Sequence, residues 1–388
     1  MRTRSAGSSD SDRSMGDDDA TEKATEAPAA PRGEGRSDDA PSAVRPGRNP
    51  FRAPVSRRRR AFRIALLATP LVLGLWGWAA MIRMPGRSFE GPLPPLTSGE
   101  EVLRDELERD VRTLALDIGE RHAQRYGALQ DAAEFIEGAL RSAGHDVARQ
   151  GYPLDGRTYE NLEVEIPGGA RANEILVVGA HYDSEVGTPG ANDNGSGVAA
   201  LLALARRLAD DRPARTVRLV AFVNEEMPHF REGTMGSGVY ARRCRDRGET
   251  VAGMISLETM GYFSDEPGSQ RYPFPFGLFY PDRGNFIGFI GNLESRDLVR
   301  SAISSFRRHA RFPSEGGALP AWVPGVGWSD HASFWAHDYP AIMITDTAPF
   351  RYPHYHRRTD TPDRVDYPGL SRVVSGVVAM VRELADAR

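Results

Sequence analysis

The feature of this sequence that most restricts its fold is an uninterrupted apolar run that ends at a histidine. Residues 175–179 contain no polar side chain and lead directly into Ala180-His181-Tyr182-Asp183. A short run of this kind, without polar alternation, predicts a strand that is buried on both faces. Such strands occur in sheets that helices cover on both sides.

The segment after this strand predicts a loop that presents Asp193. Residues 190–197 are rich in Gly, Asn and Asp, and Ser196 is placed to cap an apolar helix that begins near residue 198. His181 and Asp183 point the same way in extended chain, so Asp183 could accept a hydrogen bond from His181. Carboxylates orient metal-binding histidines in this way. The alternative is a hydrogen-bonded histidine without a metal.

The remainder of the chain alternates between predicted strands and helices. A helix that opens with a capping box of Ser98 and Glu101 begins this part. The alternation predicts an α/β fold: a three-layer sandwich with a mixed, largely parallel central sheet flanked by helices. Sites in such sheets form at the carboxyl ends of strands. Strands are predicted at residues 159–166, 174–180, 216–223, 251–258, 286–290 and 341–344.

The N-terminal part predicts a membrane anchor. Residues 64–82 carry no charge, lie between Arg63 and Arg83, and are long enough to cross a bilayer. Arginines at 57–60 precede the span, which places the N-terminus in the cytoplasm and the rest of the chain outside. A cleaved signal peptide and a buried helix are the alternatives. The first would need an n-region of about 60 residues, which is far too long.

The resulting organisation has four parts. Residues 1–60 form a disordered cytoplasmic tail, because Ser, Asp, Pro and Gly dominate there. Residues 61–83 form the signal anchor and residues 84–97 a linker. Residues 98–388 form the catalytic domain.

Composition excludes several classes of site. A net charge of −4 gives no electrostatic case for nucleic-acid binding. The single lysine, Lys23, lies in the tail, so a lysine nucleophile in the folded part is excluded. The single cysteine, Cys244, excludes an intrachain disulfide and a multi-cysteine zinc site. Neighbouring arginines could lower the pKa of Cys244, and an inert thiol is the alternative.

Acidic and histidine side chains recur where predicted strands end. Two histidines and three carboxylates form a mixed nitrogen and oxygen ligand set that suits a pair of zinc ions, with a carboxylate as bridge. Glu225 and Glu226 are adjacent and face opposite ways in extended chain, so one can bind metal while the other faces substrate. Solvated surface loops are the alternative for these segments. The candidates are His181, Asp193, Glu225, Glu226, Glu258 and His356.

This order of residues resembles the co-catalytic dizinc exopeptidases, which include bacterial leucyl-type aminopeptidases, glutamate carboxypeptidases and glutaminyl cyclases. The resemblance covers about residues 100–388. It is carried by His181-Tyr182-Asp183, the segment 190–197, Asn224-Glu225-Glu226, Leu257-Glu258-Thr259 with Gly261-Tyr262, Ser329-Asp330-His331, and His356 with Asp360-Thr361.

The resemblance implies a role for each candidate. Asp193 would bridge two zinc ions, with His181 and Glu258 completing one set and Glu226 and His356 the other. Glu225 matches the general base of the family, and Asp183 the residue that orients His181. A cis peptide bond would follow Asp193.

Two segments depart from the family pattern, and a third supports the site. The family mostly carries aspartate where this chain has Glu258, so that metal could bind differently. Residues 227–236 form a longer segment at the cleft rim, where His229 could contact substrate or serve structure. Asp330 and His331 would support the site without binding metal.

The predicted function is zinc-dependent hydrolysis of peptide bonds by an aminopeptidase, with a peptide and, through one helix, the membrane as partners. The alternatives are a carboxypeptidase, a glutaminyl cyclase with one zinc on Asp193, Glu226 and His356, and an inactive binding ectodomain.

Overall fold

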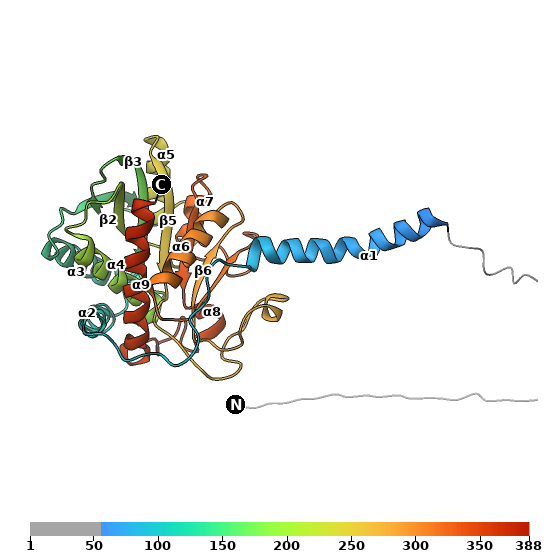
Figure 1. The fold of residues 1–388 in the computed structure, drawn as a ribbon. Helices are drawn as coiled ribbons and strands as arrows, with labels where there is room; N and C mark the ends of the chain where they lie inside the picture. The colour runs from blue at the N-terminus through green and yellow to red at the C-terminus, as the bar shows by residue number, and fades with distance from the viewer. Residues whose placement is uncertain (1–55, 388) are drawn as a thin grey trace, which may run out of the picture. The chain divides into compact units, whose positions relative to one another are not determined.

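A mixed sheet of eight strands forms the centre of the protein (Figure 1). The computed structural model describes residues 56–387, so nearly all of the predicted disordered tail lies outside the described residues. The strands occur in the order β1-β2-β4-β3-β5-β8-β6-β7. They are β1 (Ala148–Leu154), β2 (Arg157–Ile166), β3 (Arg171–His181), β4 (Arg215–Phe222), β5 (Thr250–Glu258), β6 (Ile287–Gly291), β7 (Ser314–Ala318) and β8 (Ala341–Thr345).

The four central strands, β4, β3, β5 and β8, run parallel to one another. β1 and β2 continue the sheet antiparallel on one side. On the other side β6 is antiparallel to β8 and parallel to β7. The predicted mixed sheet with a parallel centre is therefore confirmed.

Helices cover both faces, which confirms the predicted three layers. Alternate residues of β3 enter different cores: Leu176 and Val178 pack with α4 and α9, whereas Ile175 and Val177 pack with α5 and α7. The helices are α1 (Arg57–Gly77), α2 (Ser98–Arg112), α3 (Tyr126–Ser142), α4 (Gly197–Leu208), α5 (Gly236–Asp246), α6 (Arg296–His309), α7 (His331–Trp335), α8 (Ala348–Arg351) and α9 (Tyr367–Asp386).

Two predicted helix caps are wrong. The capping box of α2 consists of Thr97 and Glu100, one residue before the predicted pair, because Ser98 is already helical. Ser196 does not cap α4, since its hydroxyl donates to the carbonyl of Asn192. The side chain of Asn194 accepts the hydrogen bond from the N–H of Gly197 instead.

The predicted anchor is helical from Arg57 to Ile82 and is long and apolar enough to cross a membrane. Its large apolar side chains are exposed, with Leu67 at 76%. The predicted linker, residues 84–97, contains no helix or strand before Thr97 but contacts the catalytic domain: Met84 packs against the core and Ser88 accepts a hydrogen bond from Ser314.

Candidate metal centre

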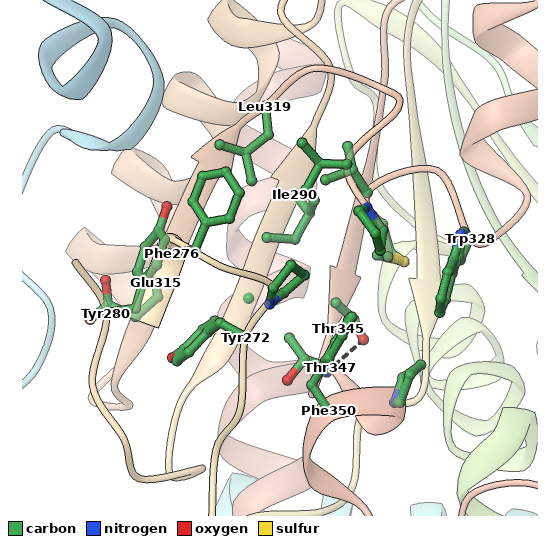
Figure 2. Close-up of a pocket in the computed structure, with 18 of the residues that line it drawn as sticks. Tyr272, Phe276, Tyr280, Ile290, Glu315, Leu319, Trp328, Thr345, Thr347 and Phe350 are labelled. Atoms are coloured by element: carbon green, nitrogen blue, oxygen red, sulfur yellow. Dashed lines mark hydrogen bonds between the residues drawn. The ribbon is translucent and has the colours of Figure 1, made fainter. Parts of the chain in front are cut away.

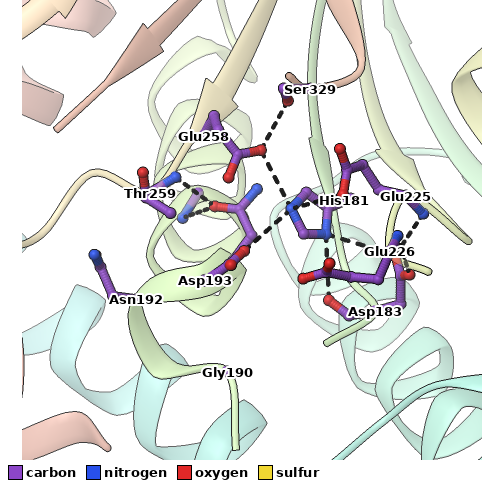
Figure 3. A network of polar contacts seen from close by, with 12 residues as sticks. His181, Asp183, Gly190, Asn192, Asp193, Glu225, Glu226, Glu258, Thr259 and Ser329 are labelled. Atoms are coloured by element: carbon purple, nitrogen blue, oxygen red, sulfur yellow. Dashed lines mark hydrogen bonds and ion pairs between the residues drawn. The ribbon is translucent and has the colours of Figure 1, made fainter. Parts of the chain in front are cut away.

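Two histidines and three carboxylates from five separate segments meet at the carboxyl ends of the central strands. Figure 3 shows His181, Asp193, Glu226 and Glu258 of this cluster. His181 is the last residue of β3 and Glu258 the last of β5. Asp193 lies in the loop before α4, and Glu226 follows β4. His356 comes from the loop after α8. The structure thus brings together every side chain that the sequence nominated as a ligand.

Asp193 lies between the two histidines. One carboxylate oxygen is 3.4 Å from Nε2 of His181 and the other is 3.1 Å from Nε2 of His356. His181 Nε2 is also 3.2 Å from Glu258, and His356 Nε2 is 3.5 Å from Glu226. Two ligands of one tetrahedral zinc lie roughly 3.3 Å apart, given zinc–ligand bonds of about 2.0–2.1 Å. Both donor sets match this spacing.

Three donor atoms of the cluster are buried without a hydrogen-bond partner in the described chain. They are Nε2 of His181, Oδ2 of Asp193 and Oε1 of Glu226. Buried polar atoms are normally hydrogen-bonded, so three such atoms in one cluster call for a partner that the protein itself does not supply. Imidazole nitrogen and carboxylate oxygen are donors that zinc accepts. The residues therefore fit zinc.

The electrostatics of the cluster also call for a cation. Burial, together with neighbouring carboxylates, raises the pKa values of Glu225 and Glu226 well above their usual range. Burial alone would lower the pKa of His181, but Glu258 and Glu225 raise it well above the ordinary value. Buried carboxylates in this number need positive charge to stay ionised together.

Asp183 connects the two halves of the cluster. Its carboxylate lies 3.5 Å from Nδ1 of His181, and its backbone carbonyl oxygen lies closer, at 3.2 Å. The same carboxylate accepts hydrogen bonds from the backbone N–H groups of Glu225 and Glu226, at 3.1 and 3.0 Å. Asp183 therefore positions both the histidine and the acidic pair.

Glu225 is buried beside the histidine, with its carboxylate 4.0 Å from Nε2 of His181. Unlike Glu226, it makes no approach to His356 within 4 Å. Its carboxylate forms a group of possible donors with His181 and Glu226, beside the group that contains Asp193.

The loop that carries Asp193 is held by groups from distant parts of the chain. The two carboxylate oxygens of Asp360 accept the backbone N–H groups of Asn192 and Asp193, at 2.9 and 3.1 Å. The buried guanidinium of Arg121 donates to the carbonyls of Tyr182, Pro189 and Gly190. The peptide bond that follows Asp193 is cis, as the family resemblance implied.

Three contributors were not anticipated from sequence. Glu185 lies close enough to Glu226 and His356 to offer a further ligand atom. Ser329 donates to the carboxylate of Glu258 at 2.7 Å. Arg121 fixes the metal loop although it lies 69 residues before Gly190. Only the order Ser329-Asp330-His331 gave a signal in advance, as a segment that supports the site.

The other flagged residues lie outside the cluster. His229 is buried and its Nδ1 is 3.2 Å from the hydroxyl of Thr234, within its own segment. Asp330 is buried with both carboxylate oxygens unpartnered in the described chain. Cys244 is buried, and burial raises the pKa of its thiol to about 12, so the expected inert thiol fits better than a reactive one.

Comparison with known proteins shows which protein family this chain matches. The model of peptidase family M28 matches residues 161–381. The uncharacterized protein YfbL of Escherichia coli is 39% identical over 286 residues, which cover 71% of this chain and 87% of YfbL. Leucine aminopeptidase 1 of Arthroderma otae is 24% identical over 302 residues, 73% of this chain and 74% of that protein.

Solved structures share the fold. The zinc aminopeptidase BSAP of Bacillus subtilis aligns with a TM-score of 0.58 and 15% identity, over 73% of this chain and 95% of BSAP. The glutaminyl cyclase of Bacteroides thetaiotaomicron aligns with a TM-score of 0.55 and 19% identity, over 72% and 97%. Both peptidases and cyclases therefore use this architecture.

Proposed function

The chain belongs to peptidase family M28, and from that premise we propose that it is a zinc-dependent aminopeptidase with Asp193 shared between two zinc ions. The observation that carries the proposal is the position of Asp193, whose two carboxylate oxygens approach two different histidines. His181 and Glu258 would complete one set, and Glu226 and His356 the other.

The chemistry divides between the metal and the chain. When bound, zinc supplies a Lewis acid that polarises the scissile carbonyl and makes water more acidic. Glu225 takes the proton of the attacking water and returns it to the leaving amine. Asp183 holds His181 and the backbone of Glu225 in place, so it acts as a positioning residue.

Release of N-terminal residues is the direction that the relatives favour, because leucine aminopeptidase 1 is among them. A glutaminyl cyclase with one zinc would need only Asp193, Glu226 and His356. This chain also retains His181 and Glu258 3.2 Å apart, with Ser329 bonded to Glu258, and a one-zinc enzyme has no use for that second set. A carboxypeptidase remains the competing outcome of the test below.

We propose a four-part chain: a cytoplasmic tail at residues 1–60, a single-pass anchor at 61–83, a linker at 84–97 and an extracytoplasmic catalytic domain at 98–388. The exposed apolar side chains of α1 support the anchor, since a helix in a soluble core would bury them. The arginines at 57–60 support the orientation.

The test is Glu225→Gln, with Glu232→Gln as a matched control on an exposed position of the next segment. Loss of the general base should lower kcat by at least about 100-fold. Zinc content, measured by elemental analysis, should stay at two per chain in both variants. Wild-type turnover of free-amine dipeptides, without turnover of N-acetylated ones, is expected. Cleavage of blocked peptides would indicate a carboxypeptidase, and an active Glu225→Gln enzyme would overturn the base assignment.

A further inference from the structure

Four neighbouring strands carry one row of residues that leads away from the metal centre. Glu258 pairs with Thr345, Thr345 with Gly288, and Gly288 with Glu315. Residues paired in this way project from the same face of a sheet. The row therefore extends from a metal ligand to Glu315 over three strand spacings, or about 14 Å.

The middle of this row is open because its residues are small. Thr345 is short and Gly288 has no side chain, so the row forms the floor of a pocket between two carboxylates. The walls are formed by loops at residues 270–280 and 319–328, of which the first contains the 3-10 turn Phe276–Leu278, and by the short helix α8. Figure 2 shows Glu315 beside Tyr280 at one end of the pocket and Trp328 toward the other. The pocket is lined mainly by apolar and aromatic side chains, among them Phe276, Ile290, Leu319, Trp328 and Phe350.

The carboxylate of Glu315 has no hydrogen-bond or ion-pair partner within residues 56–387. The hydroxyl of Tyr280 donates to the carbonyl of Gly316, and the hydroxyl of Tyr272 donates to that of Pro281. Arg307 is near, but its guanidinium donates to Ser314 and to the carbonyl of Pro85. Burial raises the pKa of Glu315, and the nearby charge of Arg307 offsets this rise only in part.

An unpaired, half-buried carboxylate in an otherwise mainly apolar pocket discriminates among side chains. A neutral side chain that reached Glu315 would strip water from it without returning a hydrogen bond, which is costly. A cation would pair with it through a charge-assisted hydrogen bond. The rings of Tyr272 and Tyr280, stacked 5.6 Å apart, favour a cation further.

On this basis, which presupposes the proposed function, we propose that the pocket binds the side chain of an N-terminal arginine or lysine and that Glu315 determines this specificity. The methylene stem of the substrate side chain packs along Ile290 and the tyrosine rings, and its charged end reaches Glu315. Short apolar side chains occupy only the part of the pocket near Thr345.

The experiment uses the full chain and compares aminoacyl 4-nitroanilides of arginine, citrulline, leucine and tyrosine. Citrulline matches arginine in shape but carries no charge. Wild-type kcat/KM should favour arginine over citrulline by at least about 10-fold. Glu315→Gln should remove this preference and leave leucine turnover unchanged. Glu294→Gln, an exposed acid in the loop after β6, is the matched control and should behave as wild type.

Three results would overturn the proposal. The first is equal turnover of arginine and citrulline substrates by the wild type. The second is an equal fall in kcat/KM for every substrate in Glu315→Gln, which indicates a structural role. A preference for tyrosine that Glu315→Gln abolishes would also contradict it, since the pocket would then bind a neutral donor.

A binding measurement distinguishes failure of this pocket assignment from failure of the proposed function. If the wild type cleaves none of the substrates, calorimetry with L-argininamide and L-citrullinamide still measures the pocket. Argininamide should bind about 10-fold more tightly than citrullinamide to the wild type and equally to Glu315→Gln. Equal binding of both amides to the wild type would reject the pocket assignment by itself.

Discussion

At the scale of single residues, Glu258 shows how a longer side chain is fitted to a ligand position. The dizinc exopeptidases mostly carry aspartate there, and the extra methylene of glutamate gives the carboxylate more freedom. Ser329 removes that freedom by donating to Glu258 at 2.7 Å, and Ser329 is itself 2.8 Å from the hydroxyl of Ser256. The hydroxyl pair thus holds the carboxylate 3.2 Å from His181.

Ser329→Ala should therefore weaken zinc binding at the set formed by His181 and Glu258. Loss of a group that orients a ligand typically costs about 10–100-fold in metal affinity. Competition with a chromophoric chelator measures this directly. Ser333→Ala is the matched control, because Ser333 pairs with Ser237 at 2.9 Å outside the donor sets. Equal zinc affinities for the two variants would show that the hydrogen bond from Ser329 does not orient the carboxylate of Glu258.

The donors themselves could be predicted because each follows a recognisable apolar strand or a turn-rich loop. His181 and Glu258 are the last residues of β3 and β5, so parallel pairing brings them together without knowledge of side-chain contacts. Arg121 could not be predicted, because its partners are backbone carbonyls, which carry no sequence signal. Glu185 could not be distinguished from an ordinary surface acid, because only the fold brings it close to Glu226 and His356.

At the scale of elements, the neighbouring hydroxyl residues Thr97 and Ser98 have different roles at the start of α2. Thr97 has extended backbone angles and accepts the N–H of Glu100, whereas Ser98 lies inside the first turn. Thr97→Ala should lower the free energy of unfolding by about 1 kcal/mol, since a helix N-cap is lost. Ser98→Ala should leave it nearly unchanged. Urea unfolding of both variants measures the difference. A larger loss of unfolding free energy in Ser98→Ala than in Thr97→Ala would show that Ser98 is the N-cap, as predicted from the sequence.

The short helix α7 gives the fold a sensitivity to acid. His331 is fully buried, its Nε2 lies 2.7 Å from the carbonyl of Val326, and burial lowers its pKa to about 4. The unfolded chain binds a proton at this histidine below about pH 6.5, whereas the folded chain does so only near pH 4. The contribution of His331 to stability is therefore complete above pH 6.5 and is lost as the pH falls toward 4.

His331→Gln tests this dependence, because glutamine can still donate to Val326 but does not titrate. The free energy of unfolding of the wild type should fall more steeply between pH 6.5 and 4.5 than that of the variant. All other groups, including the metal ligands, titrate in both proteins and cancel in the comparison. Parallel pH profiles would contradict the assignment.

Two strands, β7 and β1, were not predicted from the sequence, because neither contains an apolar run. β7 (Ser314–Ala318) consists mainly of small residues, and these let Met84 and Tyr280 approach its backbone closely. β1 lies at the edge of the sheet and is mostly exposed. Pairing of β6 with both β8 and β7 is a long-range choice that local sequence does not encode, so Glu315 had no visible connection to the metal site.

At the scale of the whole molecule, the end of the proposed anchor and the segment between it and α2 contribute to the catalytic domain. Four arginines bind this backbone: Arg296 donates to the carbonyl of Ala80, Arg300 to that of Arg83, Arg307 to that of Pro85 and Arg372 to that of Pro94. Met84 packs against the core near β7. The segment therefore behaves as a part of the fold, and a soluble fragment should include it.

A fragment of residues 79–388 should accordingly be more stable than one of residues 97–388. The shorter fragment leaves the four guanidinium groups without these carbonyls and exposes the surface that Met84 covers, a loss of at least about 2 kcal/mol. Urea unfolding at equal zinc load measures the difference, and hydrogen exchange should locate the loosening at β7. Within the longer fragment, Arg296→Gln with Arg300→Gln should reproduce part of the loss, whereas Arg311→Gln, at an exposed position, should not. Equal stabilities of the two fragments would mean that residues 79–96 only connect the helix to the domain.

Because β7 carries Glu315, a fragment that is weakened there should also lose more turnover of arginyl than of leucyl substrates.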